Sequence, residues 1–425
     1  MTSSTHAVLL FIFCGSASAG ALSGRVVDLG GLPVAGVAVS LDRSGAAAVT
    51  DAQGKFSLAT VSLSKSSPAF PIPNRASAPG FFFRNGRMES AFHGGESGSD
   101  RESDAAYSLQ GRWLDDGGSG TPVPQSGPAA VAFKSAAWND TLALAKTAYL
   151  TERIAPTSAD TNLGDIVLHP AFTGAPGKFL GFDQYNFTVA GKPCLVVVPK
   201  KVRAGSPWIW RTYFWAHKPH FDSIMCANGY YLAFMDDPNL YGAPSAVASM
   251  NSFYGELTTK YGFSKKTNLV GISRGAFYAY NWGRDNIAKI STLYGDGAGM
   301  DLVSWPCGCY GTGVGSAGDW SAAKNVYGFA SDAVAKAYRG NPYQNMAPFA
   351  AAKIPIIHVY GQADDVAPPN ENVLKANDSL KVHGWQMKLL PKPNTGHVHG
   401  LDPSDGGLPG QLDTLVQFVL RNTSY

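Results

Sequence analysis

From about residue 175 onward, short apolar runs alternate with helical segments, and this rhythm constrains the fold more than any other feature of the sequence. The runs are CLVVVPK, PWIWRTYF, YYLAFMD and TNLVGIS, with helical patterns around HFDSIMCANG and SAVASMNSFYGELTTKYG between them. They are not clearly two-faced, which is typical of strands covered on both sides. The pattern predicts an α/β domain over 175–425, a mainly parallel sheet with helices on both faces. Its active edge is expected at the carboxyl ends of the strands.

A different pattern precedes this domain. Residues 23–60 contain short alternating β-type runs broken by Gly-Gly, Leu-Pro and Asp-Ala-Gln-Gly turns, which predicts a small β-sandwich. Between 64 and about 127 the composition shifts to Ser, Gly, Pro and charged residues, which predicts a long, partly disordered insertion. Because β-type runs resume between 131 and 170 and could supply the missing strands, the first domain is placed at 20–170.

The first residues have the pattern of an export signal. An apolar run from Ala7 to Cys14 is followed by the small residues Ala17, Ser18 and Ala19, which form an A-x-A cleavage pattern. The sequence therefore predicts a signal peptide over 1–19 and a secreted or periplasmic protein. No Lys or Arg precedes the run, so a buried first strand is the alternative. No later segment approaches the roughly 20 apolar residues of a membrane helix, and no stable membrane insertion is expected.

Charge and cysteines exclude further classes of function. The net charge is +3 and the basic residues are scattered, so no nucleic-acid partner is expected. Cys194 and Cys226 lie in apolar runs, as free buried thiols do. Cys307 and Cys309 lack the second pair that a zinc site needs. No metal and no cofactor are predicted, and the cysteine pairing stays open.

One short stretch carries the strongest chemical signal. The residues Gly271-Ile272-Ser273-Arg274-Gly275 fit G-x-S-x-G and stand between the strand TNLV and the helix AFYAYNWGRDN. A turn this tight strains the serine backbone, and a side chain at either glycine would collide with the neighbouring strand or helix. The stretch resembles the nucleophile elbow of the α/β-hydrolases, which implies that Ser273 is a nucleophile. A purely structural turn is the alternative.

In α/β-hydrolases an acid and then a base follow the serine along the chain. The apolar strand Ile354–Tyr360 ends in GQADDVAPP, which resembles the acid loop of the family and implies Asp364, with Asp296 as the alternative acid. The segment NTGHVHGLDP offers two bases. The Gly-His pair favours His397, and His399 then lines the pocket or braces the loop. Histidine suits the role because its ordinary pKa lies near neutrality.

Two donors are needed to hold an oxyanion. The backbone N–H of Arg274 would be the first. Arg211 and Thr212, which stand at the predicted strand end within PWIWRTYFWAHKPH, lie where the second is expected. The His-Gly-Gly-Gly segment of many lipases is absent, which favours a wide, aromatic-lined site. The candidate wall residues are Trp210, Trp215, Trp282 and Trp305. For each of them, core packing is the alternative.

The Ser-Arg pair of the elbow resembles the G-C-S-R motif of glucuronoyl esterases, although Ile272 replaces the Cys. The resemblance implies that the Arg274 guanidinium helps to hold the oxyanion near a uronic acid ester. A guanidinium there could equally clamp a substrate carboxylate. An arginine that is ion-paired on the helix surface is the alternative.

The wider resemblance covers both domains. The segments DDPNLYGAP, GQADDV and GHVHGLDP look like an exported bacterial group of carbohydrate-esterase-like or prolyl-oligopeptidase-like α/β-hydrolases, and 23–60 resembles the carboxypeptidase regulatory-like domain. These resemblances imply the fold and the triad. Export, the accessory sandwich, the aromatic residues and the Ser-Arg elbow favour a secreted serine esterase that acts on acetyl, methyl or uronate esters of cell-wall carbohydrates. Its partner would be a small-molecule or polysaccharide ester. The alternatives are a peptidase or small-ester hydrolase, and a non-catalytic glycan-binding protein on a hydrolase scaffold.

Overall fold

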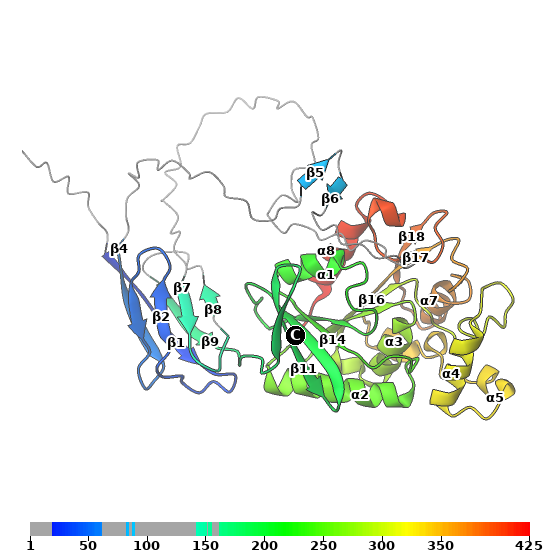
Figure 1. The fold of residues 1–425 in the computed structure, drawn as a ribbon, viewed down its shortest axis with the longest axis horizontal. Helices are drawn as coiled ribbons and strands as arrows, with labels where there is room; N and C mark the ends of the chain where they lie inside the picture. Colours follow the sequence, from blue (N-terminus) through cyan, green and yellow to red (C-terminus); the bar gives the residue numbers. More distant parts are fainter. Residues whose placement is uncertain (1–18, 62–81, 85–86, 90–141, 151, 155–160) are drawn as a thin grey trace, which may run out of the picture. The chain divides into compact units, whose positions relative to one another are not determined.

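The computed structural model describes residues 19–61, 82–84, 87–89, 142–150, 152–154 and 161–425 (Figure 1). The chain divides into two compact units. They comprise Met1–Ala78 with Arg112–Ala171, and Pro79–Gly111 with Phe172–Tyr425. Except for Ala19, the predicted signal peptide lies outside the described residues. So does the predicted insertion at 64–127, apart from the short antiparallel pair β5 (Phe82–Arg84) and β6 (Arg87–Glu89).

The first unit contains two small sheets. Its strands are β1 (Ala19–Val27), β2 (Ala38–Leu41), β3 (Ala47–Val49), β4 (Lys55–Val61), β7 (Leu142–Ala145), β8 (Glu152–Ile154) and β9 (Thr161–Val167). One sheet has the order β4-β1-β9 and the other β3-β2-β7-β8. Apolar side chains from both sheets, among them Leu22, Val39 and Leu144, form one buried cluster. Its assignment to the carboxypeptidase regulatory-like family stays a prediction.

The second unit is built on a nine-stranded sheet. Its strands are β10 (Ala175–Phe179), β11 (Phe182–Val189), β12 (Lys192–Val198), β13 (Trp208–Arg211), β14 (Tyr231–Met235), β15 (Thr267–Ile272), β16 (Ile290–Asp296), β17 (Ile356–Gly361) and β18 (Lys388–Lys392). The spatial order is β10-β11-β12-β14-β13-β15-β16-β17-β18. Pairing is antiparallel from β10 to β14 and parallel from β14 to β18. The unit has the α/β-hydrolase fold, as predicted.

Helices cover both faces of this sheet. They are α1 (His220–Ala227), α2 (Pro244–Gly255), α3 (Gly275–Asp285), α4 (Ala317–Tyr327), α5 (Asp332–Lys336), α6 (Ala347–Ala351), α7 (Val373–Val382) and α8 (Gln411–Asn422). A π-helical turn, Glu256–Lys260, continues α2, and short 3₁₀ turns lie at Ile287–Lys289, Pro342–Gln344 and Pro403–Asp405. Helices α1 and α8 lie on one side of the sheet, and α2 and α3 lie on the other (Figure 1).

Strand alternation decides what each tryptophan of β13 contacts. Ile209 belongs to the buried cluster that includes residues of α1 and α8. Its neighbour Trp210 points to the opposite face, since successive side chains of a strand alternate. There the Trp210 ring packs edge-on against Trp282, with 5.0 Å between centroids. Trp210 is 1% and Trp282 0% exposed. The prediction that these two residues line an open pocket is therefore wrong.

Candidate active site

The predicted elbow lies at the carboxyl end of β15. Ser273 has φ +48°, a left-handed conformation that is rarely adopted by a residue with a side chain and that concentrates at functional sites. A Cβ added at Gly271 would lie 2.7 Å from the Cα of Ala276, and one at Gly275 would lie 2.8 Å from the Cβ of Tyr213. Both glycines are therefore required by close backbone packing around the serine.

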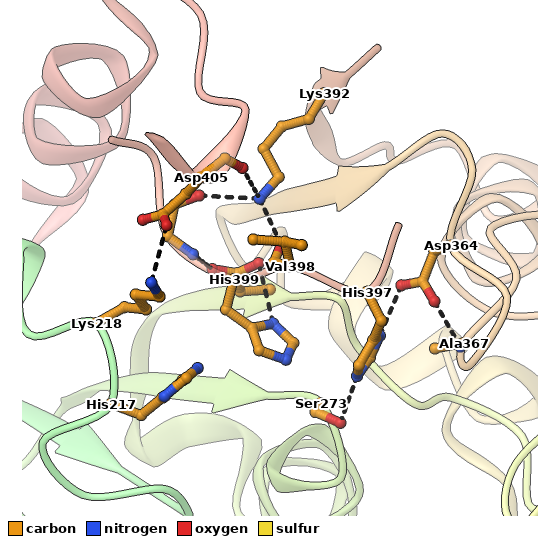
Figure 2. A network of polar contacts seen from close by, with 12 residues as sticks. His217, Lys218, Ser273, Asp364, Ala367, Lys392, His397, Val398, His399 and Asp405 are labelled. Atoms are coloured by element: carbon orange, nitrogen blue, oxygen red, sulfur yellow. Dashed lines mark hydrogen bonds and ion pairs between the residues drawn. The ribbon is translucent and has the colours of Figure 1, made fainter. Parts of the chain in front are cut away.

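The structure brings Ser273, His397 and Asp364 into one hydrogen-bonded chain (Figure 2). Ser273 Oγ lies 3.0 Å from His397 Nε2, and His397 Nδ1 lies 2.8 Å from Asp364 Oδ2. The other carboxylate oxygen, Oδ1, accepts from the N–H groups of Val366 and Ala367 at 2.9 and 2.8 Å. Because these amides fix the carboxylate, Nδ1 carries the proton that faces it. Nε2 is then able to accept a proton from the serine.

The loop that carries the histidines is held by a buried lysine. Lys392, the last residue of β18, is 0% exposed, and its ammonium donates to the carbonyls of Val398, Gly400 and Asp405, the last two at 3.0 and 3.1 Å (Figure 2). Burial lowers the pKa of Lys392 although nearby carboxylates oppose the shift. Lys218 also forms an ion pair with the Asp405 side chain at 2.8 Å. These contacts fix the backbone on both sides of the second histidine.

Asp296, the alternative acid, faces His399 rather than His397. Its Oδ1 lies 3.5 Å from His399 Nδ1, while its Oδ2 accepts from the Tyr294 hydroxyl at 2.9 Å and the Gly400 N–H at 2.8 Å. Burial opposes ionisation of Asp296, but His399 and the Gly400 N–H hold its pKa below the usual value. The site thus contains two histidine–aspartate pairs, and in the structure only the pair with His397 contacts the serine.

Arg211 is turned away from the serine. The residue is 1% exposed, and its guanidinium pairs with Asp222 of α1 through Nε at 2.9 Å. It also donates to the carbonyls of His217 and Lys218 at 2.9 and 3.2 Å. The sequence predicts the second oxyanion donor near Arg211, and the Arg211 side chain is not that donor because its guanidinium is paired with these groups. It ties the loop after β13 to α1, because strand alternation directs residue 211 to that face.

The polar groups of Thr212 are likewise hydrogen-bonded within the protein. Its N–H donates to the Val270 carbonyl at 3.1 Å, and its hydroxyl contacts the carbonyls of Val270 and Gly275 at 3.0 and 2.8 Å. The next residue, Tyr213, has its amide nitrogen 3.5 Å from where a Cβ on Gly275 would lie. In the part of the chain that the structure describes, the N–H groups of Tyr213 and Arg274 have no acceptor. They are the two candidate oxyanion donors.

The Arg274 side chain is ion-paired. Its guanidinium lies 3.0 Å from Asp319 of α4 and stacks over the rings of Trp305, Tyr241 and Tyr213, with 4.7 Å to the first. Trp305 is 8% exposed, and its ring packs against the Arg274 guanidinium. The prediction that it lines an open pocket is therefore corrected. The geometry corresponds to the ion-pair alternative for Arg274, since a substrate carboxylate would have to compete with Asp319.

An aromatic cavity of about 380 Å³ lies at the carboxyl ends of β13 and β14. Its lining residues are Tyr213, Phe214, Trp215, Phe234, Met235, Asp236, Asp237 and Pro238. Of the four tryptophans predicted as wall residues, Trp215 is the one that lines it. Because Tyr213 is shared with the elbow contact, the cavity begins beside the candidate oxyanion donors.

Three further observations concern metals, membranes and cysteines. Within the described residues, no three His, Cys, Asp or Glu side chains are grouped to hold a metal ion. None of the described helices has the length and apolarity of a membrane span.

Cys307 and Cys309 form a disulfide, whereas Cys194 and Cys226 are free and buried. Burial raises the pKa of the Cys194 thiol to about 12, so it is no candidate nucleophile.

Sequence reasoning missed Tyr213 and Lys392. The predicted strand end at Arg211 and Thr212 agrees with the structure, where β13 ends at Arg211, but the next residue, Tyr213, was not considered as a donor. Lys392 could have been noticed as a charged residue at the end of a strand of the main sheet. Lysine is rarely buried there unless it is paired, so its position indicates buried partners.

Comparison with known proteins gives weak likenesses. No family model matches the sequence, and no curated protein matches it. Among solved structures, an acylaminoacyl peptidase of Pyrococcus horikoshii is 12% identical, with a TM-score of 0.44, over 68% of this chain and 47% of that one. An esterase, E25, is 17% identical, with a TM-score of 0.41, over 56% of this chain and 77% of that one. Dipeptidyl peptidase 4 of Porphyromonas gingivalis is 9% identical, with a TM-score of 0.42, over 56% and 35%.

This chain spans less than half the length of those two peptidases. Likenesses of this size support no conclusion about activity. The fold is assigned from the strand order and pairing described above.

Proposed function

We propose that the protein is a serine hydrolase that cleaves carboxylic esters through a covalent acyl-enzyme. The observation that carries the proposal is the chain from Ser273 to His397 to Asp364, with distances of 3.0 and 2.8 Å, at a serine with a left-handed backbone. A serine hydroxyl is a weak nucleophile unless a base at hydrogen-bond distance removes its proton. Here the base has that distance and is itself oriented by a carboxylate.

In the proposed reaction, Ser273 Oγ bonds to the ester carbonyl carbon while its proton passes to His397 Nε2. Asp364 stabilises the resulting imidazolium, and the N–H groups of Arg274 and Tyr213 donate to the oxyanion. When the intermediate collapses, the C–O bond to the alcohol breaks and His397 returns the proton to the leaving oxygen. A water molecule then attacks the acyl-enzyme while His397 takes its proton. When this second intermediate collapses, His397 returns the proton to Ser273 Oγ and the acid is released.

For the substrate we propose an ester on a cell-wall carbohydrate, cleaved outside the cytoplasm. The aromatic cavity of about 380 Å³ beside Tyr213 supports a substrate larger than a simple ester, because its volume and lining are typical of small-molecule sites. The predicted signal peptide and the Cys307–Cys309 disulfide support export, since disulfides persist in oxidising compartments.

The test is acetate and methanol release from acetylated xylan, methylated pectin, a glucuronoyl ester and p-nitrophenyl acetate, with peptide anilides in parallel. Ser273→Ala serves as the matched control. We expect release from one carbohydrate ester that is lost in the variant. Faster cleavage of anilides would favour the peptidase alternative, and activity on p-nitrophenyl acetate alone would leave the triad but remove the carbohydrate substrate.

Labelling by a fluorophosphonate probe separates an enzyme from a binding protein. Wild type should react and Ser273→Ala should not. Glycan binding without labelling would show a non-catalytic protein, and full activity in Ser273→Ala would overturn the proposed nucleophile.

A further inference from the structure

The active site holds a second imidazole that the proposed reaction does not use. His399 is 8% exposed, and its ring packs edge-on against the rings of His397 and His217, with centroids 4.6 and 5.4 Å apart. A ring nitrogen that has no partner inside the protein is free to bind a group of the substrate. In the described part of the chain, no hydrogen-bond partner contacts His399 Nε2.

The buried carboxylate fixes which nitrogen of His399 carries the proton. Nδ1 lies 3.5 Å from Asp296 Oδ1, and neither atom has a closer hydrogen-bond partner among the described residues. An ionised carboxylate only accepts, so the proton of a neutral imidazole resides on the nitrogen that faces it. Nε2 is then left with a lone pair and is an acceptor.

The ring is also held in one orientation. Gly297 has φ +53°, and a Cβ there would lie 2.7 Å from His399 Cε1 and 3.3 Å from His397 Cε1, so both rings pack directly on this backbone. Lys392 binds the carbonyls on both sides of residue 399. Figure 2 shows the Nε2 side of the ring pointing into the space between His217 and Ser273.

We propose that His399 Nε2 accepts a hydrogen bond from a hydroxyl group of the leaving alcohol, so that the enzyme prefers esters of polyols. This inference rests on the proposed serine hydrolase mechanism. His397 must deliver its proton to the leaving oxygen, which places the alcohol against the loop that carries both histidines. A neutral acceptor favours an O–H donor there and disfavours a carboxylate, which has no proton to give.

The experiment compares two esters of the same size, 2-hydroxyethyl butyrate and propyl butyrate. In His399→Phe we expect the ratio of their kcat/KM values to fall about fivefold to tenfold, the effect of one lost neutral hydrogen bond, whatever change in rate the two esters share. The exposed His383, changed to Phe, is the matched control and should leave the ratio unchanged.

A second variant tests the tautomer itself. In Asp296→Asn an amide can donate to His399 Nδ1, which moves the ring proton to Nε2 and makes it a donor. The preference for 2-hydroxyethyl butyrate should fall and cleavage of 2-methoxyethyl butyrate should rise relative to propyl butyrate. The ¹⁵N shifts of the His399 ring should show the proton on Nδ1 in wild type and on Nε2 in the variant. A purely structural role would not produce this exchange.

The outcomes are separable from those of the proposed function. If His399→Phe lowers both esters equally or leaves their ratio unchanged, the acceptor role is wrong and the serine mechanism stands. If Ser273→Ala cleaves both esters as wild type does, the serine mechanism itself is wrong. Should His399→Phe fail to fold, the ester ratios in Asp296→Asn decide the question alone.

Discussion

The carboxyl edge of the sheet and the interior just behind it contain the same types of ionisable residue, but these residues differ in whether a substrate can reach them. At the edge, His397 pairs with Asp364 and its other nitrogen meets a serine that substrate can reach. In the interior, Arg211 pairs with Asp222, and His358 contacts the Tyr280 hydroxyl at 2.6 Å. Both Arg211 and His358 are at most 1% exposed.

The difference shows that residue type alone does not mark chemistry. A charged or ionisable group becomes available to a substrate where its side chain points into the loops at the strand ends, whereas a side chain that points toward the covering helices is enclosed. Changes at the edge should therefore act on activity, and changes in the interior should act on stability. Four variants test this division.

The largest effect is expected at the edge. In Asp364→Asn, the retained Oδ1 still accepts from Val366 and Ala367, but the amide faces His397 Nδ1 and favours the wrong tautomer. We expect kcat to fall by about 10⁴-fold, the size of effect that this change has in serine proteases. The free energy of unfolding should change little. Ester hydrolysis and urea unfolding measure the two, and the exposed neighbour variant Asp365→Asn should change neither.

The next effect belongs to the interior and depends on pH. Burial lowers the pKa of His358 to about 3, so the ring stays neutral in the folded protein while it is protonated in the unfolded chain below about pH 6.5. The unfolded state then binds more protons, and stability falls as the pH drops from about 6.5 to about 3, by up to about 5 kcal/mol from this residue. His358→Gln should flatten this dependence.

Urea unfolding at several pH values measures that slope. The exposed His383→Gln should retain the wild-type slope. An unchanged slope in His358→Gln would mean that His358 takes up its proton over the same pH range in the folded and unfolded states.

Removing the buried cation should also act on stability. Arg211→Met leaves the Asp222 carboxylate buried without its partner, and we expect a loss of about 3–5 kcal/mol. The double variant Arg211→Met, Asp222→Leu should recover most of that loss, because no charge then remains unpaired. Urea unfolding of wild type, both single variants and the double variant measures the coupling. Equal stability of Arg211→Met and wild type would contradict the enclosed role of Arg211.

The contacts among the predicted triad residues follow from local order along the chain, while their catalytic roles stay a proposal. Ser273, Asp364 and His397 each follow an apolar strand, and parallel strands bring their carboxyl ends to one edge. What local order cannot give is the direction of a side chain at a strand end and its partner from another element. For this reason the sequence did not predict that Trp210 packs in the core against Trp282 or that Arg211 pairs with Asp222.

Two other misses have different causes. The second candidate oxyanion donor, Tyr213, depends on the residue at which β13 ends. The hairpin of β10 and β11 was not predicted because its half-exposed, largely polar strands lack the apolar runs of the central sheet.

The smallest effect is expected at Arg274, where the two regions meet. Its backbone N–H is a candidate oxyanion donor at the edge, whereas its side chain is already paired with Asp319 and stacked on Trp305. Arg274→Met retains the N–H and removes a partly exposed ion pair, so kcat/KM should fall by less than about tenfold, since such pairs contribute about 0–1 kcal/mol. The fall should be equal for methyl butyrate and monomethyl succinate, which differ by a free carboxylate. A selective loss with the succinate would show that the guanidinium leaves Asp319 to bind substrate, and would return Arg274 to the role that the Ser-Arg pair implied.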